Sequence, residues 1–239
     1  MSLRLNKTQI QFIAAFAMTL DHIAWVLAPG YSYQWWALLF HMAGRIAAPV
    51  MWFFIAQGYE KTKDLKGYAA RLLAFAVISH FAYCIFTGNS FIPFADSFFE
   101  QTSIIWPLFS GLLGIYIAEC EALKKWHKAF LILILCALTF SADWSCTSVC
   151  AIVWIHINKG SFKKQVIGTG VIAAISGIVI FIMADKVYGL LQLCTILAFP
   201  LIKAYNGKKG NMPLGGYFLY IYYPAHLVLL GILRLLIFP

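Results

Sequence analysis

Long apolar stretches recur along the whole chain, and only short runs of charged residues separate them. A stretch of about 20 apolar residues is what an α-helix needs to cross a hydrocarbon core of about 30 Å. The chain is 62% apolar and 11% charged, whereas a soluble domain carries about 25% charged residues. Because so few polar side chains cannot cover such a chain in water, the sequence predicts an all-α polytopic membrane protein.

Breaks at glycine, proline and charge clusters divide the chain into nine expected spans. They cover residues 9–28, 35–57, 67–87, 103–123, 128–141, 144–158, 164–184, 187–204 and 215–237, of which the fifth and sixth are short. We therefore expect a bundle of about nine transmembrane helices in a single domain, residues 1–239. The first span contains Asp21 and His22 and is followed by further spans without a small-residue cleavage site, which favours a retained helix over a signal peptide.

Lysine and arginine fall into every second loop. Fifteen of the 18 basic residues lie in one set of loops, whereas the other set carries Asp96, Glu100, Asp143, Asp185 and Lys186. By the positive-inside rule, this alternation predicts a cytoplasmic N-terminus in a bacterial cytoplasmic membrane. With nine spans, the C-terminus would end outside.

The net charge of +9 does not indicate nucleic-acid binding, because the basic residues form short runs between spans and no continuous basic face. The expected surroundings are the lipid bilayer. The cysteines show no CxxC pairing, and most lie in apolar segments, where cysteine packs as a small hydrophobic residue. We therefore expect no disulfide and no metal site among Cys84, Cys120, Cys136, Cys146, Cys150 and Cys194.

Three expected spans carry ionisable side chains at a similar depth. Counted at about 1.5 Å per residue, Asp21 lies about 4 Å and Arg45 about 1.5 Å outward of their span midpoints, and His226 lies close to its own. A charge at a helix centre costs about 2.5–3.5 kcal/mol, so such residues usually face a bundle interior or a wet cavity. The sequence thus predicts that the first, second and last spans share a site.

Asp21 and His22 are neighbours, and on a helix their directions differ by about 100°, so each needs a partner elsewhere. Asp21 and Arg45 form the natural ion pair across adjacent helices, and His22 and His226 are the groups that can move protons near neutral pH. A structural role stays open for each: the ion pair as an interhelical contact, His22 as a hydrogen-bonding partner, and His226 as a packed residue beside the kink expected at Pro224.

The remaining histidines are weaker candidates. His80, after Ser79, is expected either to line the same cavity or to be packed. His41 and His156 lie nearer span ends and are expected to be packed, and His127 lies in a lysine-rich loop at the surface.

The loop after the second span is basic and contains tyrosines. Lysine and arginine are phosphate partners, and a helix that begins near Gly67 points its positive end at an anion. This pattern indicates either a phosphate-binding site or an anchor to anionic lipid. The candidate phosphate-binding residues are Lys61, Lys63, Lys66, Tyr68 and Arg71.

Taken in order, several short motifs resemble the TraX family of membrane acyltransferases, known for N-acetylating pilin. The matching pieces are Asp21 to Trp25, Gly44 to Pro49 with Gly58-Tyr59, Tyr68 through Arg71 to Ser79, Asp143-Trp144, and Tyr220 to Leu227. The chain departs from the family pattern at Gln57 and His80, where glutamates are expected, and at the start of the fourth span.

The resemblance implies that acetyl-CoA is the acyl donor, held from the cytoplasm by the basic residues at span ends, and that a mid-membrane histidine acts on the acetyl group. It implies His22 as general base on an amine or hydroxyl acceptor that arrives from the outer side, with Asp21 and Arg45 fixing the local charge and His226 as the second candidate histidine. An acetylated His22 intermediate is the alternative.

A proton-coupled secondary transporter is the second hypothesis, because buried Asp, Arg and His are also what a proton relay needs. Against it, the sequence shows no inverted repeat and no pair of broken spans in corresponding halves.

Overall fold

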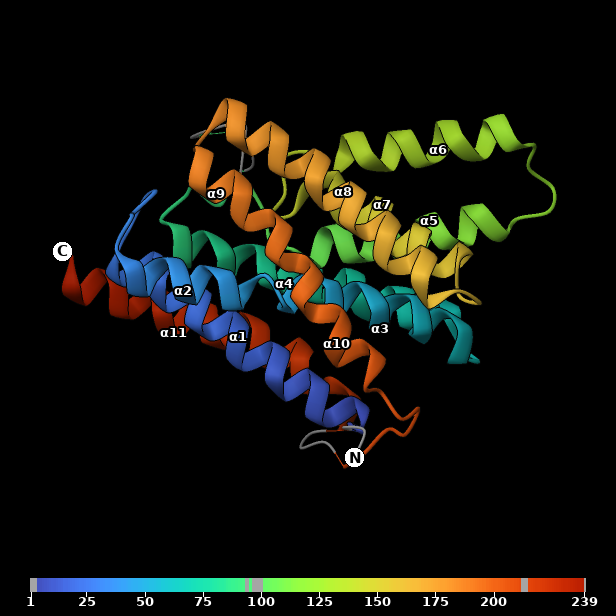
Figure 1. Cartoon of the computed structure of the whole chain (residues 1–239), viewed down its shortest axis with the longest axis horizontal. Helices are drawn as coiled ribbons and strands as arrows, with labels where there is room; N and C mark the ends of the chain where they lie inside the picture. The colour runs from blue at the N-terminus through green and yellow to red at the C-terminus, as the bar shows by residue number, and fades with distance from the viewer. Residues whose placement is uncertain (1–3, 93–94, 96–100, 212–214, 239) are drawn as a thin grey trace. The chain divides into compact units, whose positions relative to one another are not determined.

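The computed structural model describes residues 4–92, 95, 101–211 and 215–238, and this part of the chain is helical (Figure 1). Two isolated bridges, Leu5 to Tyr205 and Thr102 to Ala142, are its β-type pairings. The expected loop charges Asp96 and Glu100 lie outside the described residues. The helices are α1 (Lys7–Leu27), α2 (Trp35–Gly44), α3 (Ala47–Lys61), α4 (Leu65–Thr87), α5 (Ile105–Glu119), α6 (Lys125–Leu138), α7 (Ser145–Ile157), α8 (Phe162–Met183), α9 (Lys186–Leu191), the 3-10 helix η1 (Gln192–Leu197), α10 (Ala198–Lys203), η2 (Gly215–Tyr217) and α11 (Phe218–Ile237).

Each expected span coincides with a helical segment of the described chain, which confirms the all-helical prediction. Six segments there are long and apolar enough to cross a membrane, with α2 and α3 counted as one and the run from α9 to α10 as another. α5 and α7 are shorter apolar helices. Several apolar helices of this length are compatible with a multi-pass membrane protein, whereas nine crossings and a cytoplasmic N-terminus stay predictions.

The break between α2 and α3 follows from Pro49. Proline has no N–H, and its ring clashes with the carbonyl of the residue four positions earlier, which here is Arg45. The chain tightens instead: Ile46 N donates to the Ala43 carbonyl at 3.1 Å, three residues back. The break therefore lies at Arg45 and Ile46, between the end of α2 and the start of α3.

The described residues form two compact units. Unit 1 comprises Met1–Val50 and Gly170–Pro239, and unit 2 comprises Met51–Thr169. Each unit is a set of residues that contact one another more than they contact the rest of the chain. The single functional domain expected over residues 1–239 stays a prediction.

In unit 1, α1 packs along α2 on one side and α11 on another. At one end the chain before α1 pairs with the loop after α10: Leu5 N donates to Ala204 O at 2.8 Å, and Lys7 N to Lys208 O at 2.9 Å. At the other end, the Tyr188 hydroxyl donates to Ser32 O at 3.1 Å. Two expected basic loops therefore share an end of this unit.

In unit 2, α5 packs on α4, α6 and most extensively on α7. A methyl group at Gly111 would lie 2.4 Å from Ile152 Cδ1, so glycine permits this close approach of α5 and α7. The ends of α3, α5 and α7 meet where His156 contacts Glu60 and Glu119. The expected basic loops of unit 2 therefore also gather at one end.

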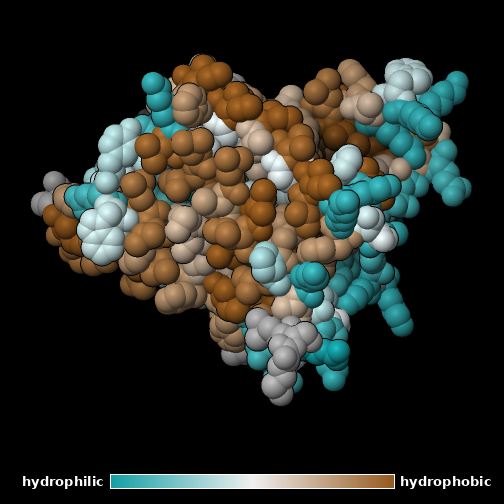
Figure 2. Space-filling model, in the orientation of Figure 1, coloured by the Kyte–Doolittle hydropathy of each residue, from teal (hydrophilic) through white to brown (hydrophobic). Residues whose placement is uncertain are grey.

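Large apolar side chains are exposed on helices of both units. Ile182 is 72% exposed and Leu236 75% exposed, although both belong to long helices. Figure 2 shows hydrophobic residues over most of the visible face, with hydrophilic ones gathered toward its margins. Such a surface suits lipid and would be costly in water.

Candidate functional site

The site in unit 1 begins with two successive residues of α1 that face different helices. Asp21 bonds to His41 on α2, and His22 bonds to His226 on α11. This divergence is what the helical rotation of about 100° per residue requires. One turn of α1 therefore supplies two polar contacts that point to separate neighbours.

His22 and His226 form a buried pair. His22 is only 8% exposed and His226 only 6% exposed. His22 Nδ1 lies 2.8 Å from His226 Nε2. His226 Nδ1 lies 3.0 Å from the carbonyl oxygen of Tyr222, and a carbonyl only accepts, so this nitrogen carries the proton. In the neutral rings, His226 Nε2 is then the acceptor and His22 Nδ1 the donor. The network thus assigns the remaining lone pair to His22 Nε2, the form that a general base needs.

Aromatic packing holds this pair in place. The Tyr222 ring stacks on His226 with centroids 5.1 Å apart and planes at 12°. The Tyr222 hydroxyl forms a hydrogen bond with Thr19 on α1, which ties α11 to α1 three residues before His22. The Tyr223 ring meets His226 edge-on at 5.5 Å. Because the imidazole is enclosed in this way, its orientation follows from the packing of α1 and α11.

Asp21 has two partners at different distances. Its Oδ1 lies 2.8 Å from His41 Nδ1 and 3.7 Å from the nearer Arg45 nitrogen. The structure thus brings the expected pair Asp21 and Arg45 together, but the hydrogen bond goes to His41. A methyl group at Gly44 would lie 2.4 Å from Asp21 Cβ, so only glycine lets α2 approach the carboxylate this closely.

His41 is the residue that sequence reasoning undervalued. It is 0% exposed and packs against the rings of Trp25, with centroids 4.8 Å apart, and Tyr188, with centroids 5.1 Å apart. His41 lies four residues before Arg45, and this spacing places both side chains on one helix face. That spacing was the signal in the sequence that could have pointed to His41 as a site residue. Because the Asp21 carboxylate accepts from Nδ1, His41 Nε2 carries the lone pair in the neutral ring, and it has no hydrogen-bond partner within the described residues.

The candidate phosphate-binding residues lie in unit 2, on the turn between α3 and α4 and the first turns of α4. Lys61, Lys63 and Lys66 are exposed, and Tyr68 and Arg71 are partly buried. Tyr68 packs against α3, since a methyl group at Gly58 would lie 2.8 Å from its hydroxyl.

The start of α4 already holds a carboxylate. Asp64 caps the helix by accepting from Gly67 N at 2.8 Å. Any phosphate at this turn therefore depends on the lysine and arginine side chains.

Two weaker candidates have ordinary partners. His80 Nε2 lies 3.1 Å from the carbonyl oxygen of Phe91, and His127 stacks on Trp126 with centroids 3.5 Å apart. Both belong to unit 2. A group of three or more potential metal ligands does not occur in the described part of the chain.

Unit 1 therefore combines apolar helices of spanning length with a buried histidine pair and a neighbouring Asp, His and Arg cluster. This combination defines a helical protein of the multi-pass membrane type whose buried ionisable side chains mark its candidate functional site. The family model described as TraX protein matches residues 6–234, so the chain belongs to the TraX family, as the motifs indicated.

One curated relative shares 29% identity over 229 residues, which is 93% of each chain. It is the "Probable fimbrial assembly protein FimC, serogroup H1" of Dichelobacter nodosus. No solved structure matches this chain.

Proposed function

We propose that this TraX-family protein is a membrane-embedded acyltransferase that moves an acetyl group from acetyl-CoA to an amine or hydroxyl acceptor. The observation that carries the proposal is the proton arrangement of the histidine pair. A backbone carbonyl orients His226, His226 orients His22, and in the neutral rings the lone pair on His22 Nε2 can serve as the base. A base held by a second group through its other nitrogen is the arrangement that activates nucleophiles in acyl transfer.

In the proposed reaction, His22 Nε2 removes a proton from the acceptor as its nitrogen or oxygen attacks the thioester carbonyl. The carbon–sulfur bond breaks, and the proton on His22 passes to the leaving sulfur, so that the products are the acetylated acceptor and the free thiol. His226 Nε2 accepts the hydrogen bond from His22 Nδ1–H throughout the reaction, which keeps the His22 ring in position while that ring is charged. The Asp21 carboxylate, next in the chain, favours that positive charge, and Arg45 limits the local excess of negative charge.

The donor has a candidate binding region in unit 2. The segment from the end of α3 to the start of α4 carries three exposed lysines, Lys61, Lys63 and Lys66, and Arg71 lies further along α4. Such a group fits the phosphates of a nucleotide thioester. We place this basic end in the cytoplasm on the positive-inside rule, with the N-terminus on the same side.

The acceptor class follows from the chemistry of a neutral histidine base, which suits an amine or a hydroxyl. The relative from Dichelobacter nodosus is named as a fimbrial assembly protein. A fimbrial subunit is accordingly one acceptor to include in a test beside small amines and alcohols.

The test uses the purified full chain in detergent with radiolabelled acetyl-CoA, following thiol release and acetyl transfer to an acceptor panel. His22→Ala should lower turnover by about 10²–10⁴-fold, the usual contribution of a general base, while acetyl-CoA still binds. His226→Leu should also lower turnover and should change the pH dependence of kcat/KM, because the second ring holds the first. His80→Ala, which removes a histidine of unit 2, is the matched control and should leave turnover unchanged.

Arg71→Ala should weaken acetyl-CoA binding with little change in kcat. Wild-type protein that neither binds nor cleaves acetyl-CoA would remove the enzyme hypothesis. In that case, proton flux into vesicles that depends on His22 would support the alternative, a proton-coupled transporter that uses the same buried groups.

A further inference from the structure

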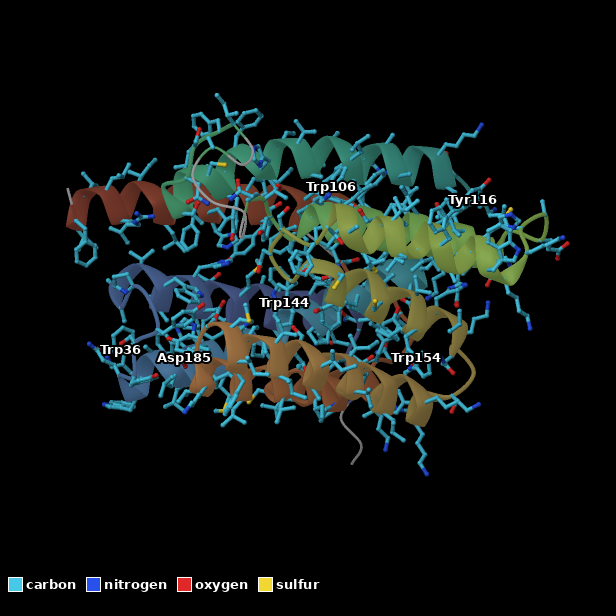
Figure 3. The ribbon with its side chains drawn as sticks, turned by 90° about the horizontal axis from the view of Figure 1, so that it is seen from above. Trp36, Trp106, Tyr116, Trp144, Trp154 and Asp185 are labelled. Carbon is cyan, nitrogen blue, oxygen red and sulfur yellow. The ribbon has the colours of Figure 1, made fainter. Side chains whose placement is uncertain are left out.

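Unit 2 contains a pocket of about 390 Å³ that the proposed reaction does not use. It lies where the last turns of α3 and α7 meet the start of α8. Figure 3 shows Tyr116 on α5 and Trp154 on α7 toward one end of these helices, with Trp106 and Trp144 toward their other end. The volume falls near the lower end of the range of small-molecule sites, which is about 300–1,000 Å³.

A buried histidine lines the pocket with one nitrogen in use. His156 is 1% exposed, and its Nε2 lies 2.8 Å from Glu119 Oε1. Since a carboxylate only accepts, Nε2 carries the proton, and Nδ1 of the neutral ring carries the lone pair. Within the described chain, His156 Nδ1 has no hydrogen-bond partner.

A second acceptor lies close to that nitrogen. Glu60 Oε1, which also lines the pocket, lies 3.7 Å from His156 Nδ1. A single donor nitrogen can lie at about 2.9 Å from both atoms, but it must offer two hydrogens. An ammonium group meets this requirement, whereas a hydroxyl offers one hydrogen.

The charges nearby leave room for a cation. Glu60 and Glu119 both contact His156, and Lys159 Nζ lies 3.8 Å from Glu60 Oε1, beyond a direct hydrogen bond, with its side chain 58% exposed. Lys128 instead donates to the Ala118 carbonyl at 2.7 Å. Lys128 and Lys159 both act electrostatically on Glu119, so with a neutral histidine it is Glu60 that faces one loosely held lysine.

The rest of the pocket suits an apolar body. Phe53, Ile155 and Phe162 supply apolar lining beside these polar groups. The side-chain N–H of Gln165 already donates to Ile155 O at 3.1 Å, so this glutamine offers its oxygen, a further acceptor. Apolar side chains and hydrogen-bond acceptors therefore both line the pocket.

We infer that this pocket binds a small primary amine with an apolar body, its ammonium group held between Glu60 and His156. The site is distinct from the histidine pair of unit 1 and does not depend on acyl transfer. It gives an otherwise lysine-rich end of unit 2 a specific position for an organic cation.

Calorimetric titration of the full chain in nanodiscs tests the inference with three probes of one shape: phenethylamine, phenethyl alcohol and phenylacetate. Phenethylamine should bind saturably and at least about tenfold more tightly than either other probe, because a charge-assisted hydrogen bond is lost with them. Glu60→Gln should weaken phenethylamine binding by about tenfold or more. Glu121→Gln, an exposed carboxylate after α5, is the matched control and should bind as wild type.

A second variant keeps the inference testable if the Glu60→Gln protein does not fold. Lys159→Met removes the competing cation from an exposed position and should tighten phenethylamine binding several-fold. Equal or tighter binding of the alcohol or of phenylacetate, no saturable amine binding, or a Lys159→Met protein that binds the amine more weakly would overturn the inference. Because binding is measured without acetyl-CoA, these outcomes are separate from the success or failure of the acyltransferase proposal.

Discussion

The two units place a buried histidine in opposite kinds of surroundings. In unit 1, His22 bonds to a second imidazole whose proton position is set by a backbone carbonyl. In unit 2, His156 bonds to the carboxylate of Glu119, a side chain 51% exposed at a helix end. Both rings keep a lone pair on the remaining nitrogen, but the first belongs to a mid-helix pair and the second faces another carboxylate. The partner of each ring, more than the histidine itself, is thus what separates the two proposals.

The largest expected effect on stability comes from removing the carboxylate charge of unit 1, and the matching change in unit 2 should have a much smaller effect. Asp21→Asn should lower the free energy of unfolding by about 3 kcal/mol, because it leaves buried His41 and Arg45 without their anion. Glu119→Gln should cost less than about 1 kcal/mol, since its side chain is half exposed and water replaces the contact. Unfolding in mixed detergent, followed by circular dichroism, measures both. Equal costs would contradict the contrast between the units.

A smaller effect should follow from filling the space where α2 meets α1. Gly44→Ala places a methyl group 2.4 Å from Asp21 Cβ, and overpacking of this kind costs about 1–3 kcal/mol. Gly160→Ala is the control from unit 2, because nothing lies within 4 Å of the added carbon. The same unfolding measurement should show a change within about 0.5 kcal/mol there. A Gly44→Ala protein as stable as wild type would mean that α2 does not approach Asp21 this closely.

The smallest effect concerns an exposed pair at the end of unit 1. The Tyr33 hydroxyl donates to Asp185, and this hydrogen bond, with those from the N–H groups of Tyr188 and Val187, lowers the pKa of the Asp185 carboxyl, while the carboxylate raises the pKa of Tyr33. Figure 3 shows Asp185 and Trp36 toward the same end of this unit.

Because the folded-state pKa of Asp185 is lowered, its contribution to stability is complete above the unfolded pKa of about 3.9 and is lost as pH falls through the folded value. Tyr33→Phe should raise the pKa of Asp185 toward its ordinary value, as measured by carbon NMR titration of labelled aspartate. Its unfolding curve should converge with that of wild type as the pH falls below about 4. Tyr217→Phe should leave the titration of Asp185 unchanged; an equal shift in that control would show that the hydrogen bond is not the cause.

Several features of the site followed from the sequence alone. The apolar stretches predicted the helices, because length and composition are local properties of a segment. The adjacency of Asp21 and His22 predicted that they need different partners. The motifs in their order indicated the TraX family, which the family match confirms.

The choice of partners was decided only by the tertiary structure. Asp21 bonds to His41 at 2.8 Å although the sequence offered Arg45 as the obvious counter-ion, and His22 meets a histidine 204 positions away. His156, expected to be a packed residue, lies between two carboxylates on different helices. Periodicity states which face of a helix is polar, but it does not state how neighbouring helices are rotated and shifted against one another. Those two quantities set which nitrogen meets which oxygen, and they arise from the packing of segments that are distant in the chain.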